Sequence, residues 1–107
     1  MKRWEVVYTY EAKKDCASLD PAALNQVDKA IRKVSQNPLP QSEGGYGKPL
    51  GNKNSNNLTG LLKIKLLKLG IRVVYKLVRT DEAMKIIVVA ARADNEVYAI
   101  AAKRIDT

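Results

Sequence analysis

The sequence has no histidine and a single cysteine, and each scarcity excludes a class of chemistry. Without histidine the usual acid–base group near neutral pH is missing, so a histidine-driven nuclease mechanism is excluded. Cys16 alone cannot form an internal disulfide or a cysteine-rich zinc site, and it is typical of a reducing compartment. We identify no cofactor.

Long apolar segments are also missing. No run reaches the length of a membrane span, and no apolar stretch follows Lys2 and Arg3 as it would in a secretion signal. The sequence therefore predicts a cytoplasmic protein with no membrane association.

Negative charge is absent from one long stretch. Between Gly44 and Thr80 there are eight Lys and Arg residues and no Asp or Glu, whereas the rest of the chain holds eleven cations and eleven anions. This stretch therefore carries the whole net charge of +8. A basic surface attracts polyanions, with nucleic acid first, an acidic protein second and an anionic membrane third. A solvated basic surface with no ligand is the alternative.

The 107 residues suit one domain, residues 1–107. Hydrophobic periodicity and turn residues predict a strand at 3–10, helices at 11–19 and 21–37, strands at 61–67, 71–78 and 84–91, and a helix at 94–105. Asp20 and Asp94 are possible helix caps. Residues 38–60, with three prolines and five glycines, are expected to form a long polar loop. The order β-α-α-β-β-β-α predicts an α+β fold in which a mostly antiparallel sheet packs against helices.

Within the stretch "LKIKLLKLGIRVVYK" at 62–76, the expected strand 61–67 alternates strictly, so Lys63 and Lys65 share one face of it. If residues 67–70 form a turn that uses the free backbone of Gly70, Lys65 lies opposite Arg72 in a hairpin. Like charges directly opposite destabilise a sheet, so this pairing indicates an anion site. Lysines on the solvated face of an amphipathic sheet are the alternative.

Several motifs follow one another along the chain: "VVYTYEAKKD" near the start, "KPL" at 48–50, "LKIKLLKLGIRVVYKL", and "IIVVAARADNEVYAIAAKRI". Taken together, they resemble the RelE branch of the RelE/ParE toxin superfamily. The resemblance implies a RelE/ParE-like fold and the toxin of a type II toxin–antitoxin system, an endoribonuclease that cuts mRNA in the ribosomal A site. It also implies three partners, namely a cognate RelB-like antitoxin, the ribosome and mRNA.

The resemblance further implies the site residues Lys63, Lys65, Arg72, Arg92 and Tyr98. Metal-independent RNA cleavage uses the 2′-hydroxyl to attack the adjacent phosphate, so the enzyme must position the attack, neutralise charge and move two protons. Neighbouring cations disfavour the charged form of a lysine, which makes Lys63 a candidate general base. Lys65 and Arg72 are expected to hold phosphate, Arg92 to stabilise the leaving oxygen, and Tyr98 to stack on or orient a base.

The chain also departs from the family pattern. Ile71 stands where tyrosine is frequent, Ala91 stands where a basic residue is frequent, and the 38–60 loop is long. Two other functions stay open at this point: a ParE-like toxin that inhibits DNA gyrase, and a catalytically inactive RNA-binding regulatory module.

Overall fold

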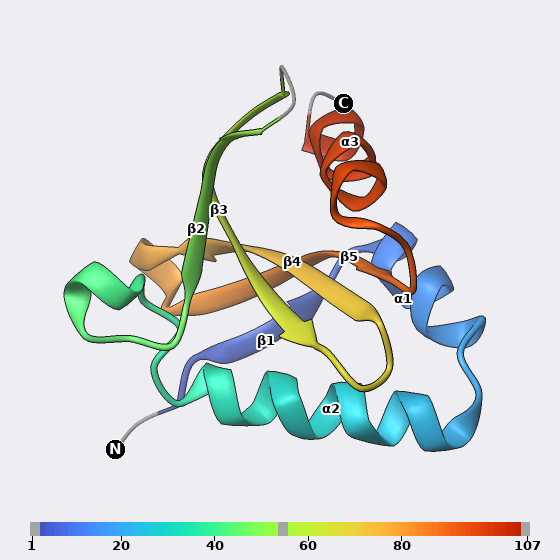
Figure 1. The fold of residues 1–107 in the computed structure, drawn as a ribbon. Coiled ribbons are helices and arrows are strands. Elements are labelled where there is room, and N and C mark those ends of the chain that lie inside the picture. Colours follow the sequence, from blue (N-terminus) through green and yellow to red (C-terminus); the bar gives the residue numbers. More distant parts are fainter. Residues whose placement is uncertain (1–2, 54–55, 106–107) are drawn as a thin grey trace.

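The computed structural model describes residues 3–53 and 56–105 (Figure 1). Its elements are, in chain order, β1 (Glu5–Tyr8), α1 (Tyr10–Ala17), α2 (Pro21–Ser35), the short 3₁₀ helix η1 (Gln41–Glu43), β2 (Lys48–Lys53), β3 (Asn56–Leu66), β4 (Ile71–Val78), the 3₁₀ helix η2 (Arg79–Asp81), β5 (Ala83–Ala90) and α3 (Asp94–Ile105). None of the helices within the described ranges is long and apolar enough to cross a membrane.

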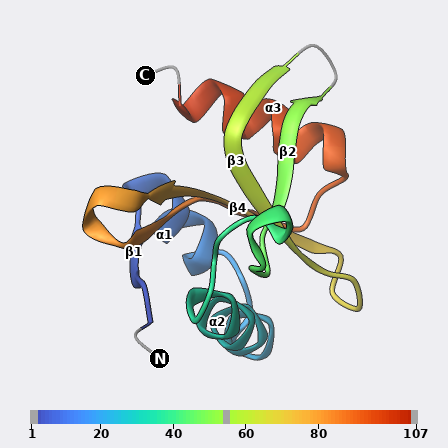
Figure 2. The ribbon, with the colours of Figure 1, turned by 90° about the vertical axis from the view of Figure 1, so that its left-hand side faces the viewer.

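The strands form one five-stranded sheet in the order β1-β5-β4-β3-β2. Only β1 and β5 pair in parallel, and the other three pairs are antiparallel. Helix α2 runs along one face of the sheet beside α1, and α3 lies on the other face, as the two views in Figures 1 and 2 show. The predicted fold class, a mostly antiparallel sheet packed against helices, is confirmed.

The predicted long loop was wrong over much of its length. Residues 48–53 form β2, and β3 begins at Asn56 rather than at 61, so the sheet has one strand more than predicted. The expectation also covers residues 54 and 55, which lie outside the described residues. Glycine, proline and asparagine are poor strand formers, and β2 is a strand because its backbone pairs with the edge of β3. The pairing register shifts between Pro49 and Gly51, which further hides the strand pattern.

Other predicted boundaries move by a few residues. The first strand is shorter than expected, and α1 and α2 each end two residues early. Asp20 is the N-cap of α2 as predicted, because its carboxylate accepts a hydrogen bond from the Ala23 amide at 2.8 Å. Strand β4 has the predicted limits, and so does α3.

The core has two parts, one on each face of the sheet. Under α1 and α2, apolar residues of the helices pack on side chains of β3, β4 and β5, among them Val27, Ile31, Leu62, Val73 and Ile86. Under α3, the second part contains Leu58, Leu61, Val74, Val88, Val97 and Ala101. Adjacent residues of β4 therefore belong to opposite cores. Helices therefore cover apolar residues on both faces of the sheet.

Candidate anion-binding site

The β3–β4 hairpin has the predicted register. Lys65 pairs with Arg72, Lys63 pairs with Val74, and Leu66 pairs with Ile71. Gly70 has a φ of +65°, a conformation that glycine adopts without a steric penalty. The hairpin turn is therefore built as the sequence indicated.

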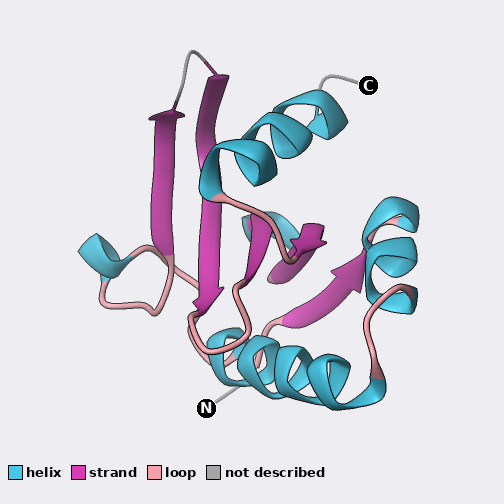
Figure 3. Cartoon of the chain, turned by 45° about the vertical axis from the view of Figure 1, so that its right-hand side comes forward, coloured by secondary structure: helices cyan, strands magenta, loops and turns pink. Residues whose placement is uncertain are grey.

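The face of each cation follows from the alternation of the strands. Leu62 and Val73 belong to the core under α1 and α2, so Lys63 and Arg72 face the side of α3. Leu61 and Val74 share that side and are covered by α3. Figure 3 shows that α3 begins near the hairpin and runs away from it. The helix therefore buries the apolar part of this face, and its N-terminus meets the charged part.

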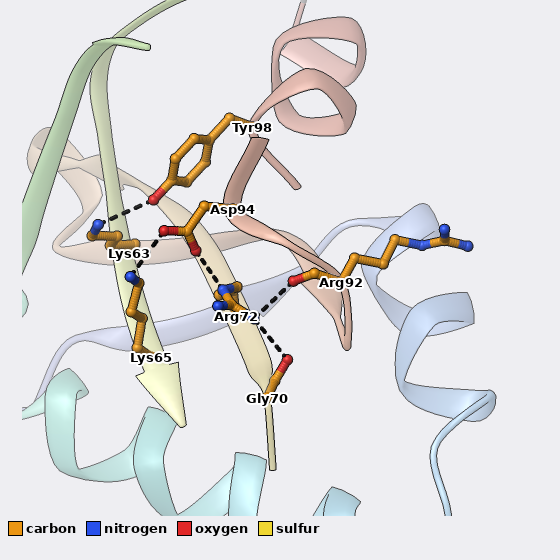
Figure 4. A network of polar contacts seen from close by, with 7 residues as sticks. All are labelled: Lys63, Lys65, Gly70, Arg72, Arg92, Asp94 and Tyr98. Carbon is orange, nitrogen blue, oxygen red and sulfur yellow. Dashed lines mark hydrogen bonds and ion pairs between the residues drawn. The ribbon is translucent and has the colours of Figure 1, made fainter. Parts of the chain in front are cut away.

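A carboxylate lies in the middle of these cations. Asp94, the first residue of α3, accepts a hydrogen bond from Lys65 Nζ at 2.9 Å and another from Arg72 Nε (Figure 4). Arg72 also donates from Nη1 to the carbonyls of Gly70 at 3.0 Å and Arg92 at 2.8 Å. The bond from Lys65, followed by that from Arg72, holds the pKa of Asp94 below its usual value despite partial desolvation. The site thus binds an oxyanion supplied by the chain itself.

Sequence reasoning missed this role for Asp94, which it interpreted as a helix cap. The helix begins at Asp94 itself, and the Val97 amide donates to the carbonyl of Ala93 at 3.1 Å. The Asp94 side chain turns toward the hairpin instead. A signal was present in the order of the strands, because Arg72 pairs with Ala90 at the end of β5, only four residues before Asp94.

Tyr98 joins Lys63 to α3. Lys63 Nζ donates to the Tyr98 hydroxyl at 3.0 Å and lies 5.6 Å from the centre of its ring (Figure 4). The Tyr98 side chain is only 3% exposed and belongs to the core under α3. This buried position does not support the predicted stacking on an RNA base. It supports a role for Tyr98 in holding Lys63.

Arg92 is the one predicted residue whose side chain does not enter the cluster. Figure 4 shows its backbone carbonyl beside Arg72 and its side chain pointing away, toward α1. Arg92 Nη1 lies 3.5 Å from the carboxylate of Glu96, and both side chains are more than half exposed. An exposed ion pair of this kind contributes little stability, so the side chain is free to change rotamer.

Lys48 adds a further cation on the same face. It pairs directly with Lys63 across β2 and β3, and opposite residues of an antiparallel pair share a face. Lys48 is exposed, as its position at the edge of the sheet requires. The sequence motif at 48–50 contained this residue, but its pairing could not be predicted while the segment was interpreted as a loop.

No group of three metal-ligating side chains occurs among the residues that the structure describes. The site is therefore defined by cations, one carboxylate and one tyrosine hydroxyl. The cationic donors of this site bind oxyanions such as carboxylate and phosphate.

No protein-family model matches the sequence, and no curated protein matches it. Solved structures do. A RelBE2 toxin–antitoxin complex from Mycobacterium tuberculosis contains a chain with 26% identity and a TM-score of 0.69, covering 88% of this chain and 97% of that one. The isolated Escherichia coli RelE toxin has 24% identity and a TM-score of 0.68, covering 95% and 98%. A free E. coli RelE in which two arginines are replaced by alanine has 25% identity and a TM-score of 0.70, covering 97% and 99%.

Fold and site together define a small α+β protein with an oxyanion site at the end of a basic hairpin. In fold the chain is similar to these solved RelE toxin chains, so the resemblance predicted from the sequence motifs is confirmed.

Proposed function

We propose that this chain is the toxin of a type II toxin–antitoxin system and a metal-independent endoribonuclease that cleaves mRNA in the ribosomal A site. The observation that carries the proposal is the convergence of Lys63, Lys65 and Arg72 on one face, with an oxyanion already held by two of them. The similarity to chains described as RelE toxins, one of them 26% identical, supports the toxin assignment.

The proposed reaction uses RNA, these side chains and solvent water. The 2′-oxygen of one nucleotide forms a bond to the adjacent phosphorus while the bond from phosphorus to the 5′-oxygen breaks. The products are a 2′,3′-cyclic phosphate and a 5′-hydroxyl. One proton passes from the 2′-hydroxyl to Lys63, and the departing 5′-oxygen takes one from solvent water. Lys65 and Arg72 neutralise the charge that grows on phosphate, an effect that is large when the donors are held in advance.

Lys63 is the proposed general base, and Tyr98 is the proposed positioning residue for it. To act as a base, Lys63 must be a neutral amine when it accepts the proton of the 2′-hydroxyl. After the transfer it is an ammonium. The Tyr98 hydroxyl serves both states, since it can accept from the ammonium and donate to the amine. The contact therefore holds Lys63 in place before and after proton transfer.

Arg92 is the proposed stabiliser of the leaving oxygen, and it must first release Glu96. That pair lies at 3.5 Å on exposed side chains, so its loss costs little. The backbone of Arg92 already contacts Arg72, so the residue lies at the edge of the cluster. Since arginine resists deprotonation, we assign it charge stabilisation rather than proton donation.

The proposed partners are mRNA, the ribosome and a RelB-like antitoxin. Solved neighbours include complexes named as RelBE toxin–antitoxin pairs. The exposed basic residues of this chain, which give it a net charge of +8, suit an acidic chain that folds as it binds. With this function, we expect the protein to act in the cytoplasm, where translating ribosomes lie.

Induction of the chain in bacteria without an antitoxin tests the proposal. We expect growth arrest and new mRNA 5′ ends that follow codon phase on ribosome-bound message, while naked RNA survives. Lys63→Ala should lower cleavage at least about a hundredfold, as expected for loss of a general base. Lys29→Ala is the matched control, because it removes one exposed lysine from α2 on the opposite face of the sheet. Equal toxicity of these two variants would contradict the proposal.

A further inference from the structure

We infer that Asp94 is a built-in competitor of phosphate: its carboxylate occupies the oxyanion position of the Lys65–Arg72 pair, and RNA must displace it to bind there. This inference rests on the proposed function and deepens it. It makes Asp94 a residue that determines which phosphates the site accepts.

The contacts of Asp94 are those that a phosphate would make. Its two oxygens are divided between Lys65 Nζ and Arg72 Nε, one oxygen to each cation. A phosphodiester likewise shares one negative charge between two oxygens, and lysine and arginine N–H groups donate to carboxylate and phosphate oxygens alike. The carboxylate and a phosphate cannot both occupy these donors. Binding of one therefore requires release of the other.

The position of Asp94 allows this release. Its side chain is 38% exposed, and it is the first residue of α3, directly after the short connection at 91–93. An acidic residue in the first turn of a helix is stabilised by the helix dipole even without an ion pair. The carboxylate can therefore leave the cations for solvent without being buried unpaired. No rearrangement of β3 or β4 is required.

The competitor raises the threshold for substrate binding rather than blocking the site. When an isolated phosphate binds, only its contacts with Lys65 and Arg72 offset the free energy lost with the Asp94 contacts. An RNA that is also held elsewhere, as on a ribosome, can use that additional binding energy to displace the carboxylate. Asp94 thereby lowers the affinity for free phosphate and naked RNA more than it hinders properly held RNA.

Titration of the purified chain with inorganic phosphate at fixed ionic strength reads the competition directly. We expect Asp94→Asn to bind phosphate roughly tenfold more tightly than the unchanged chain, the effect of removing a partly exposed carboxylate with two cationic partners. Asp81→Asn is the control, because it causes the same change in net charge in η2, at the opposite end of β4 from Arg72. Asp94→Ser, which also suits a helix start, replaces Asp94→Asn if that variant does not fold.

A double variant tests whether the tighter phosphate binding of Asp94→Asn depends on Arg72. Adding Arg72→Ala to Asp94→Asn should abolish the tighter binding. The inference is overturned if Asp94→Asn binds phosphate no better than Asp81→Asn, or if the gain survives the loss of Arg72. It is also overturned if Asp94→Asn binds phosphate more weakly, which would make Asp94 a positioning residue for its two cations.

A cleavage measurement separates this inference from the proposed function. Asp94→Asn should cleave naked RNA faster relative to ribosome-bound mRNA than the unchanged chain does. If the unchanged chain cleaves no RNA in either form, the proposed function fails, while the phosphate titration still decides the role of Asp94. If cleavage occurs and its preference for ribosome-bound mRNA is the same in both chains, the role of Asp94 in selectivity is refuted.

Discussion

The Nζ atom of Lys63 on β3 lies 3.0 Å from the hydroxyl of Tyr98 on α3, and this contact ties the basic hairpin to the last helix. The tyrosine ring is buried in the core under α3, so its position is fixed by packing. A flexible lysine is thereby held by a rigid group. Restraint of this kind is what a general base needs if it is to meet a 2′-hydroxyl in one orientation.

Tyr98→Phe tests this restraint. The substitution keeps the ring in the core and removes only the hydroxyl, so we expect a loss of stability of about 1 kcal/mol or less. Cleavage of ribosome-bound mRNA should fall roughly tenfold, as expected for a displaced catalytic group. Denaturant unfolding and single-turnover cleavage measure the two effects. A variant with full cleavage would show that Tyr98 serves packing alone.

Acid should weaken the fold partly through Asp94. Its pKa is lowered in the folded protein, first by the hydrogen bond from Lys65 and then by that from Arg72. The carboxylate therefore contributes stability above its unfolded pKa, near 3.8, and this contribution is lost as pH falls through the lower folded pKa. We expect the difference in unfolding free energy between the unchanged chain and Asp94→Asn to shrink between about pH 5 and pH 2. A difference that stays constant over this range would contradict the prediction.

Asp15→Asn should destabilise the packing of both α1 and α3. Asp15 accepts from Arg104 at 2.7 and 3.1 Å and from the Val89 amide at 2.9 Å, so one carboxylate joins α1, α3 and β5. Both charged side chains are less than a quarter exposed. Replacing one partner of such a pair should cost roughly 2–4 kcal/mol. Urea unfolding measures the loss, and Asp81→Asn, on an exposed residue, should change stability by less than about 0.5 kcal/mol.

Gly47→Ala should also destabilise the chain, for a steric reason. A Cβ atom at Gly47 would lie 2.4 Å from Leu62 Cδ2 and 2.5 Å from the Tyr75 hydroxyl. Tyr75 is buried and donates to the carbonyl of Pro38 at 2.8 Å, so it cannot move without losing that bond. We expect a loss of about 1–3 kcal/mol by thermal or denaturant unfolding. Gly44→Ala is not a suitable control, because Gly44 has a φ of +84°.

Local pattern predicted most of the fold. The alternation in 61–67 predicted which side chains of that strand share a face, and the turn at Gly70 predicted the register of the hairpin, because both depend on neighbours in sequence. Strand β2 was missed since its residues carry no strand pattern of their own. Its pairing with β3 is a tertiary effect that overrides local propensity.

The site was predicted only in part, because tertiary contacts complete it. Counting charge along the chain made the cations of the hairpin look uncompensated, although the compensating Asp94 lies 22 residues after Arg72. Only the pairing of β4 with β5 brings the two together. The side chain of Arg92 points outward beside Glu96, one helical turn away, and alternation along a strand gives no information about its direction.

We propose above all that the cationic cluster positions one RNA phosphate for attack by the neighbouring 2′-hydroxyl. The most direct measurement uses ribosomes programmed with an mRNA that carries a single 2′-deoxynucleotide on the 5′ side of the cleaved bond. Cleavage at that bond should stop, while the all-ribose mRNA yields a 2′,3′-cyclic phosphate and a 5′-hydroxyl. Continued cleavage of the deoxy-substituted bond would contradict the account.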